Sequence, residues 1–241
     1  MPYRITSFDA YEKEYKRSVQ DPEAFWNDIA SNYTWQQPWN KTLEWNFEGP
    51  EVKWFMGGKL NITENCLDRH LATKGDQTAL IWEPNDPKER FLKLSYTQLH
   101  QKVCQFANIL KRNGIKKGDR VCIYMPMIPE LMLATLACAR IGAVHSVVFA
   151  GFSAQALSDR IIDASCKMVI TSDGLYRGSK EVPVKRIVDE ALEDCDSVEK
   201  VVVVERTKWD VHMEDGRDVW YHEELTHVGD ECEAEIMDAE D

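Results

Sequence analysis

The chain has 241 residues, and 41 Asp and Glu against 29 Lys and Arg give it a formal net charge of -12 at pH 7. This balance argues against broad, sequence-independent binding to nucleic acid, because such binding needs many cations that neutralise phosphates. Any anion site in the chain must therefore rely on a few local cations. The length allows one large α/β domain with a sizeable core.

The distribution of cysteines and apolar residues bears on the compartment. The seven cysteines contain no C-x-x-C pair, which fits reduced thiols in a cytoplasmic protein. The N-terminal stretch MPYRITSFDAYEKEYKRS carries acids and no apolar core, so it is neither a secretory signal nor a transit peptide. The most apolar stretch, Val121 to Phe152, is interrupted by prolines and charges before it could span a bilayer. We therefore expect a cytoplasmic protein without a membrane partner.

Residues 1–60 are rich in aromatic side chains and predict a helical N-terminal extension. Phe8, Tyr11 and Tyr15 recur at helical spacing, and the proline after Asp21 suits the first position of a second helix. Five of the eight tryptophans lie in this region. Because rings at this density supply buried area, we interpret them as packing residues.

From residue 61 to residue 241 the pattern predicts an α/β domain. A helix at 65–73 precedes a hairpin outside the main sheet, and Ser95 with Gln98 forms a capping box that begins a helix ending at Asn113-Gly114. Four apolar runs then alternate with helices, the runs being 121–125, 144–149, 168–171 and 201–204. This alternation predicts a mostly parallel sheet with helices on both faces, and it places the stretch Val144–Lys180 in the middle of that sheet.

Two segments that follow predicted strands suggest a binding site. The carboxyl ends of parallel strands meet at one edge of a sheet, so we expect the turn Phe149–Phe152 beside the loop Arg177–Lys180. Both segments contain a glycine, Ser153 begins a helix whose free amides face the strand end, and the loop adds two cations. This arrangement predicts an anion site, most simply for a phosphate. The alternatives are an ordinary strand-to-helix connection and a solvated basic loop.

Common catalytic and metal-binding motifs are absent from the sequence. It contains no G-x-G-x-x-G, no G-x-x-x-x-G-K-[ST], no H-E-x-x-H and no G-x-S-x-G. His70 lacks a triad arrangement nearby, and His212, His222 and His227 have no partner at zinc-ligand spacing. The residues by themselves assign no catalytic group and no metal site.

Several runs resemble the adenylate-forming acyl-CoA synthetases, and the similarity extends over essentially the whole chain. The longest is GIKKGDRVCIYMPMIPELMLATLACARIGAVHSVVFAGFSAQALSDRI. The runs DPEAFWNDIASNYTW, GGKLNITENCLDRHL and HSVVFAGFS resemble the acetyl-CoA synthetase branch of that family. The resemblance implies the incomplete N-terminal portion of an AMP-forming acetate–CoA ligase. Such enzymes make an acyl adenylate from a carboxylate and ATP and then transfer the acyl group to CoA.

The resemblance also implies a ligand for the predicted anion site, namely the 3'-phospho-ADP end of CoA. The residues that match the family's contacts are Phe149, Ala150, Gly151, Arg177, Gly178, Ser179 and Lys180. This sequence has Ala150 where Gly is usual, and Ser179-Lys180 where Gly-Arg is common. Because lysine keeps the charge but loses the planar fork, Arg177 is the strongest candidate for a phosphate contact.

The same resemblance implies that the ATP phosphate loop, the acyl pocket and the mobile C-terminal domain lie beyond Asp241. We therefore expect residues 61–241 to be the first part of the AMP-binding domain and the isolated chain to be inactive. The whole enzyme would use acetate, ATP with Mg²⁺, and CoA, with the remainder of the enzyme as partner. Two alternatives stay open: a standalone CoA-binding or interaction module, and a synthetase for propionate or another short acid.

Overall fold

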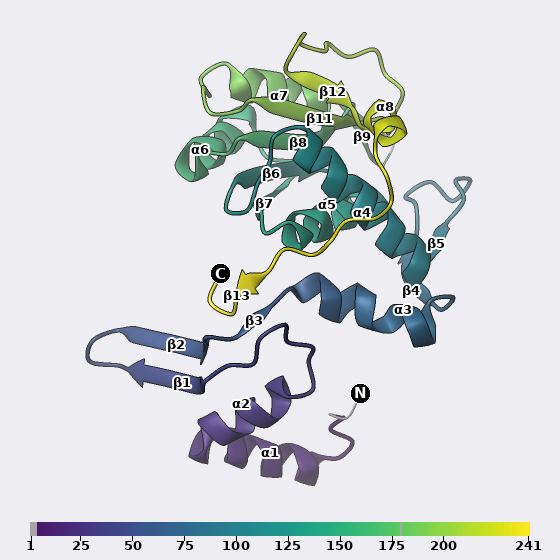
Figure 1. Ribbon diagram of the computed structural model, residues 1–241. Coiled ribbons are helices and arrows are strands. Elements are labelled where there is room, and N and C mark those ends of the chain that lie inside the picture. Colours follow the sequence, from purple (N-terminus) through teal and green to yellow (C-terminus); the bar gives the residue numbers. More distant parts are fainter. Residues whose placement is uncertain (1–3, 179) are drawn as a thin grey trace. The chain divides into compact units, whose positions relative to one another are not determined.

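The computed structural model describes residues 4–178 and 180–241, which fall into two compact units. The first unit holds Met1–Arg69 with Ile236–Asp241, and the second holds His70–Glu235. Figure 1 labels the elements of both units. The boundary expected between residues 60 and 61 stays a prediction. No helix among the described residues combines the length and the apolar character that crossing a membrane requires.

The first unit begins with two helices whose starts are marked in the sequence. α1 (Phe8–Gln20) is capped by the hydroxyl of Ser7, which accepts a first-turn amide at 3.1 Å. α2 (Pro22–Ala30) is capped by the carboxylate of Asp21, also at 3.1 Å, and has a proline at its first position. The helical N-terminal extension is therefore confirmed.

A hairpin that the sequence pattern did not indicate follows these helices. β1 (Lys41–Asn46) pairs antiparallel with β2 (Glu51–Met56). Many of the side chains are exposed on both faces, so no alternation of apolar and polar residues marks the strands. The aromatic residues form a cluster, in which the ring centroids lie 4.7 Å apart for Trp35 and Trp39 and 5.4 Å apart for Trp39 and Phe55. These rings pack against one another, as expected.

Residues from both ends of the sequence belong to the first unit. β3 (Lys59–Leu60) pairs antiparallel with β13 (Met237–Asp238). A π-helical turn, η1 (Glu64–Asp68), leads into α3 (Arg69–Lys74). The helix expected at 65–73 is confirmed by these two elements.

The second unit is built on a five-stranded sheet in the order β12-β11-β8-β6-β7. Its strands are β6 (Arg120–Met125), β7 (Val144–Phe149), β8 (Met168–Ser172), β11 (Lys200–Val204) and β12 (Asp218–Trp220). All neighbouring strands run parallel, which confirms the predicted sheet. β12 was not predicted, because it is short and carries no continuous apolar run.

β7 lies at an edge of this sheet, whereas β8 lies at its centre. The prediction that the stretch Val144–Lys180 lies in the middle of the sheet therefore holds for β8 and was wrong for β7. Its side chains Val144, Val147 and Phe149 are 54%, 51% and 63% exposed. A continuous apolar run is typical of a strand that is covered on both faces, which is why the sequence favoured an interior position. Here the apolar side chains instead stand at the border of the described sheet.

Two pairs of helices cover the two faces of the sheet (Figure 1). They are α4 (Tyr96–Arg112) with α5 (Pro129–Arg140), and α6 (Ala154–Ala164) with α7 (Val184–Leu192). The second pair shares one core with Val201 and Val203 of β11. Since side chains alternate across a strand, the equally buried Val202 faces the first pair. Helices on both faces are therefore confirmed.

The start of α4 and the hairpin before it agree with the sequence. The hydroxyl of Ser95 accepts the Gln98 amide at 3.2 Å, and the Ser95 amide donates to the Gln98 side chain at 3.0 Å, which completes the capping box. β4 (Thr78–Trp82) and β5 (Leu92–Ser95) pair antiparallel outside the main sheet. Both predictions are confirmed.

Candidate functional site

A cavity of about 740 Å³ lies at the carboxyl ends of β6 and β7 in the second unit. The turn after β7 contributes Phe149, Ala150 and Gly151 to its wall, and the loop after β8 contributes Arg177 and Gly178. These two segments were selected in the sequence because each follows a predicted strand. The structure brings them together in one cavity.

Backbone hydrogen bonds fold the turn after β7 tightly. The amides of Gly151 and Phe152 both donate to the carbonyl of Phe149, at 2.7 and 3.1 Å. The Tyr124 hydroxyl donates to the carbonyl of Phe152 at 2.7 Å. A Cβ atom at residue 151 would lie 2.5 Å from the ring of Phe149, so a larger residue there would displace this exposed ring in the cavity wall.

The alanine in this turn causes no backbone strain. Ala150 is buried in the core shared by the sheet, α6 and α7. Among the described non-glycine residues, a positive φ occurs at Phe55, Ser165 and Lys208, so Ala150 has an ordinary backbone conformation. Ser153 caps α6 as predicted, since its hydroxyl accepts a first-turn amide at 3.3 Å.

A tight hairpin carries the two predicted cations. β9 (Leu175–Arg177) pairs antiparallel with β10 (Lys180–Val182), and Lys180 is the register partner of Arg177. Gly178 has a φ of +62°, in the left-handed region that favours glycine. Like charges at opposite positions of a strand pair destabilise it. An anion bound near this hairpin would offset that repulsion.

The predicted residues of this hairpin differ in their position relative to the cavity. Arg177 is exposed and lies in the cavity wall. Lys180 is also exposed, but it is not among the described residues that line the cavity. Ser179 lies outside the described residues. Arg177 is therefore the predicted cation with direct access to the cavity.

A second cation in the cavity wall, Arg206, was missed in the sequence. Its guanidinium lies 5.4 Å from the ring centroid of Trp82 and 5.4 Å from that of Tyr176. Its two terminal nitrogens donate to the two carboxylate oxygens of Glu89, each at 2.7 Å, and this hydrogen bonding raises the pKa of Arg206. Arg206 follows the carboxyl end of β11, so the strand-end rule that selected the other two segments was the available signal.

A buried carboxylate holds the segment after β11 in place. Asp173 follows β8 and is fully buried. It accepts the backbone amides of Gly174 and of residues 206–209 at distances of 2.6 to 3.3 Å. Asp173 thereby connects the carboxyl ends of two neighbouring strands and fixes the backbone from which Arg206 extends.

A second cavity, also of about 740 Å³, adjoins the first. The two share the wall residues Asn85, Tyr176, Gly178 and Arg206. Glu89, Lys88 and Lys208 line the second cavity. Arg206 therefore belongs to both cavities, and its ion pair with Glu89 lies where they meet.

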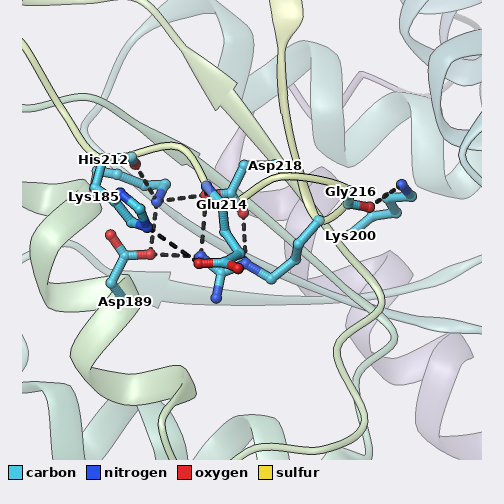
Figure 2. A network of polar contacts seen from close by, with 8 residues as sticks. Lys185, Asp189, Lys200, His212, Glu214, Gly216 and Asp218 are labelled. Carbon is cyan, nitrogen blue, oxygen red and sulfur yellow. Dashed lines mark hydrogen bonds and ion pairs between the residues drawn. The ribbon is translucent and has the colours of Figure 1, made fainter.

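A buried ion network fixes the start of α7, close in sequence to the hairpin of Arg177 (Figure 2). Lys185, whose side chain is fully buried, contacts Asp189 at 2.6 Å and Asp218 at 2.8 Å and donates to the carbonyl of His212 at 2.9 Å. Arg217 contacts the same two carboxylates at 2.7 and 2.6 Å. Burial raises the pKa of Asp218, but hydrogen bonds from Arg217 and Lys185 outweigh burial, so that its pKa is lowered.

Comparison with known proteins places the chain in a family. Residues 67–241 match the family described as AMP-binding enzyme. The chain belongs to the AMP-binding enzyme family. Residues 11–66 of this AMP-binding enzyme match a second family, described as the acetyl-coenzyme A synthetase N-terminus.

Similar proteins cover nearly all of this chain, whereas the chain covers about a third of each of them. Acetyl-coenzyme A synthetase from Bdellovibrio bacteriovorus is 54% identical over 232 residues, which are 96% of this chain and 36% of that protein. Acetyl-coenzyme A synthetase 2 from Pseudomonas putida is 51% identical over 231 residues, with the same coverage. The solved structure of acetoacetyl-CoA synthetase from Streptomyces lividans has a TM-score of 0.84 at 25% identity and covers 97% of this chain and 35% of its own. This likeness confirms the predicted fold class.

Among the described residues, no group of three His, Cys, Asp or Glu side chains could hold a metal ion. The resemblance implies Mg²⁺ only as a companion of ATP in the whole enzyme, and we assign no ligand for it in this chain.

Proposed function

We propose that this AMP-binding enzyme is the N-terminal portion of an AMP-forming acetate–CoA ligase and that its cavity binds the 3'-phospho-ADP end of CoA. The names of the similar proteins and the match of residues 11–66 support the acetate ligase. The observation that carries the ligand assignment is the single cavity lined by Phe149–Gly151 and Arg177.

The proposed reaction of the whole enzyme has two steps. A carboxylate oxygen of acetate attacks the α-phosphorus of ATP, which releases pyrophosphate and leaves acetyl-AMP. The thiol of CoA then attacks the acetyl carbon, loses its proton and releases AMP. Since the chain spans 36% of the length of the relatives, we assign to it only the binding of the CoA nucleotide, with the remainder of the enzyme as its partner. We assign no catalytic residue within this chain.

The cavity offers the groups that a phosphorylated nucleotide needs. The chain is acidic overall, so recognition of an anion depends on local donors rather than on long-range attraction. Arg177, in the cavity wall, provides a planar fork that matches phosphate oxygens. The exposed ring of Phe149 provides a surface on which a base can stack.

The test compares CoA with 3'-dephospho-CoA by isothermal titration calorimetry. We expect the wild-type chain to bind CoA about 10- to 150-fold more tightly, because one charged hydrogen bond contributes roughly 1.5 to 3 kcal/mol. We expect Arg177→Ala to lose this preference and to keep its affinity for 3'-dephospho-CoA.

Arg112→Ala is the matched control for this experiment. Arg112 ends α4 and forms an ion pair with Glu224 at 3.2 Å, and it is not among the described residues of either cavity wall. Its removal should change neither affinity. If Arg177→Ala weakened both ligands equally, or neither, the assigned contact with the 3'-phosphate would be wrong.

A further inference from the structure

The guanidinium of Arg206 is held rigidly at the junction of the two cavities. Trp82 and Tyr176 contact it at 5.4 Å, and the indole N–H of Trp82 donates to the carbonyl of Met127 at 2.8 Å, which fixes that ring. The backbone of Arg206 donates to Asp173 at 2.7 Å. The side chain of Arg206 is 18% exposed, and both its backbone and its guanidinium are held in place by these contacts. Such orientation lowers the entropy cost of binding a ligand.

Glu89 accepts both hydrogen bonds of the Arg206 guanidinium, in the way that a phosphate group also could. A carboxylate and a phosphate both accept two parallel N–H bonds from a guanidinium. Glu89 lies in the connection between β4 and β5, whose sequence EPNDPKER is typical of a turn-rich loop. Its side chain is 33% exposed, so water can replace Arg206 as its partner when the pair opens.

The charges around the junction favour exchange of Glu89 for a ligand. Arg206 and Arg177 line the same cavity, and Tyr176 connects them, since it contacts the first and precedes the second in β9. A phosphorylated ligand beside Arg177 brings negative charge toward the carboxylate of Glu89 and repels it. This repulsion weakens the pairing of Glu89 with Arg206, so that the guanidinium becomes free to bind phosphate oxygens.

We propose that Arg206 is a further specificity-determining residue of this cavity, which binds phosphate oxygens of the ligand in place of Glu89. The inference rests on the proposed function of the cavity as a nucleotide site of CoA. A guanidinium that only stabilises the loop between β4 and β5 is the structural alternative, and the two roles differ in what removal of the carboxylate does to affinity.

The test measures binding of CoA and of inorganic pyrophosphate to the purified 241-residue chain and its variants by calorimetry, with circular dichroism to verify folding. Glu89→Gln removes the competing charge, so we expect about fivefold tighter binding of both probes together with a lower melting temperature. Arg206→Lys keeps the charge but loses the fork, so we expect about fivefold weaker binding of both. A purely structural pair predicts that Glu89→Gln binds no more tightly.

Glu224→Gln and Arg112→Lys form the matched control pair, because Arg112 of α4 and Glu224 of α8 (Tyr221–Glu224) make an ion pair outside the described walls of both cavities. Neither should change affinity. If the wild-type chain bound neither probe, the proposed function and this inference would both fail. If wild type and Arg177→Ala behaved as proposed, but Glu89→Gln bound no more tightly or Arg206→Lys kept full affinity, only the inference on Arg206 would be overturned.

Discussion

Asp173 shows how a single buried side chain organises loops that are distant in sequence. Its carboxylate accepts the amide of the next residue and four amides at positions 206–209. An asparagine in its place would turn an NH₂ group toward some of these amide donors. The carboxylate is therefore needed for its accepting oxygens and not only for its charge.

We expect Asp173→Asn to lower the free energy of unfolding by about 2 to 4 kcal/mol, because several buried amides lose their acceptor. Urea denaturation followed by circular dichroism measures this change. Asp163→Asn, at an exposed position of α6, is the control and should stay within about 0.5 kcal/mol of wild type. A stability equal to that of the control would show that the amides find other partners.

The difference between Arg177 and Arg206 shows what sequence reasoning reaches at the scale of one residue. Arg177 stands in a loop with a glycine and a second cation, so its neighbours in sequence mark it. Arg206 gains its role from Glu89, 117 positions away, and from rings in other elements. The position of Arg206 after the strand at 200–204 marks it only as a residue of the sheet edge. No local pattern identifies Glu89 or these rings as its partners, because they meet only after folding.

Elements were predictable where their own residues determine them. The capping box of Ser95 and the cap of Ser153 fix helix starts through hydrogen bonds within one turn, and both were found. The hairpin of β1 and β2 was not predicted, because many of its side chains are exposed and show no apolar pattern. The edge position of β7 was not predicted either, because it depends on the order of the strands. Strand order is a property of the whole sheet, so an apolar run alone does not reveal it.

The ion network of α7 gives this element a dependence on pH. The folded pKa of Asp218 is lowered, so its pairing contributes stability above the unfolded value of about 3.9. That contribution is lost as the pH falls through the lowered folded pKa. We expect Asp218→Asn to be less stable at pH 7 by about 3 to 5 kcal/mol, because Lys185 keeps a buried charge with fewer partners, and to lose less stability on acidification.

Unfolding free energies from pH 7 to about pH 3 measure this difference. The control is Asp194→Asn, at an exposed position just after α7. Its profile should run parallel to that of wild type, since other carboxylates are common to both. If the profiles of Asp218→Asn and wild type ran parallel instead, the pairing of Asp218 with Lys185 and Arg217 would not contribute to the loss of stability at low pH.

At the scale of the whole molecule, the chain corresponds to only part of its relatives. It spans 36% of the curated relatives that it matches, and no adenylation group is assigned within it. We therefore expect the isolated chain to catalyse no acetate-dependent exchange of pyrophosphate into ATP. An acetyl-coenzyme A synthetase such as that of Bdellovibrio bacteriovorus serves as the positive control. Exchange above background by the isolated chain would mean that adenylation groups lie within these 241 residues.

The edge position of β7 has a consequence for the chain in solution. An apolar edge strand offers unpaired amides and carbonyls to any similar strand, including that of a second copy. The turn that begins at Phe149 lies at the end of this strand and forms part of the cavity wall. Copies that extended each other's sheet along β7 would therefore crowd the entrance to this cavity. Such self-association would compete with a ligand in the cavity, and dilution would favour the ligand.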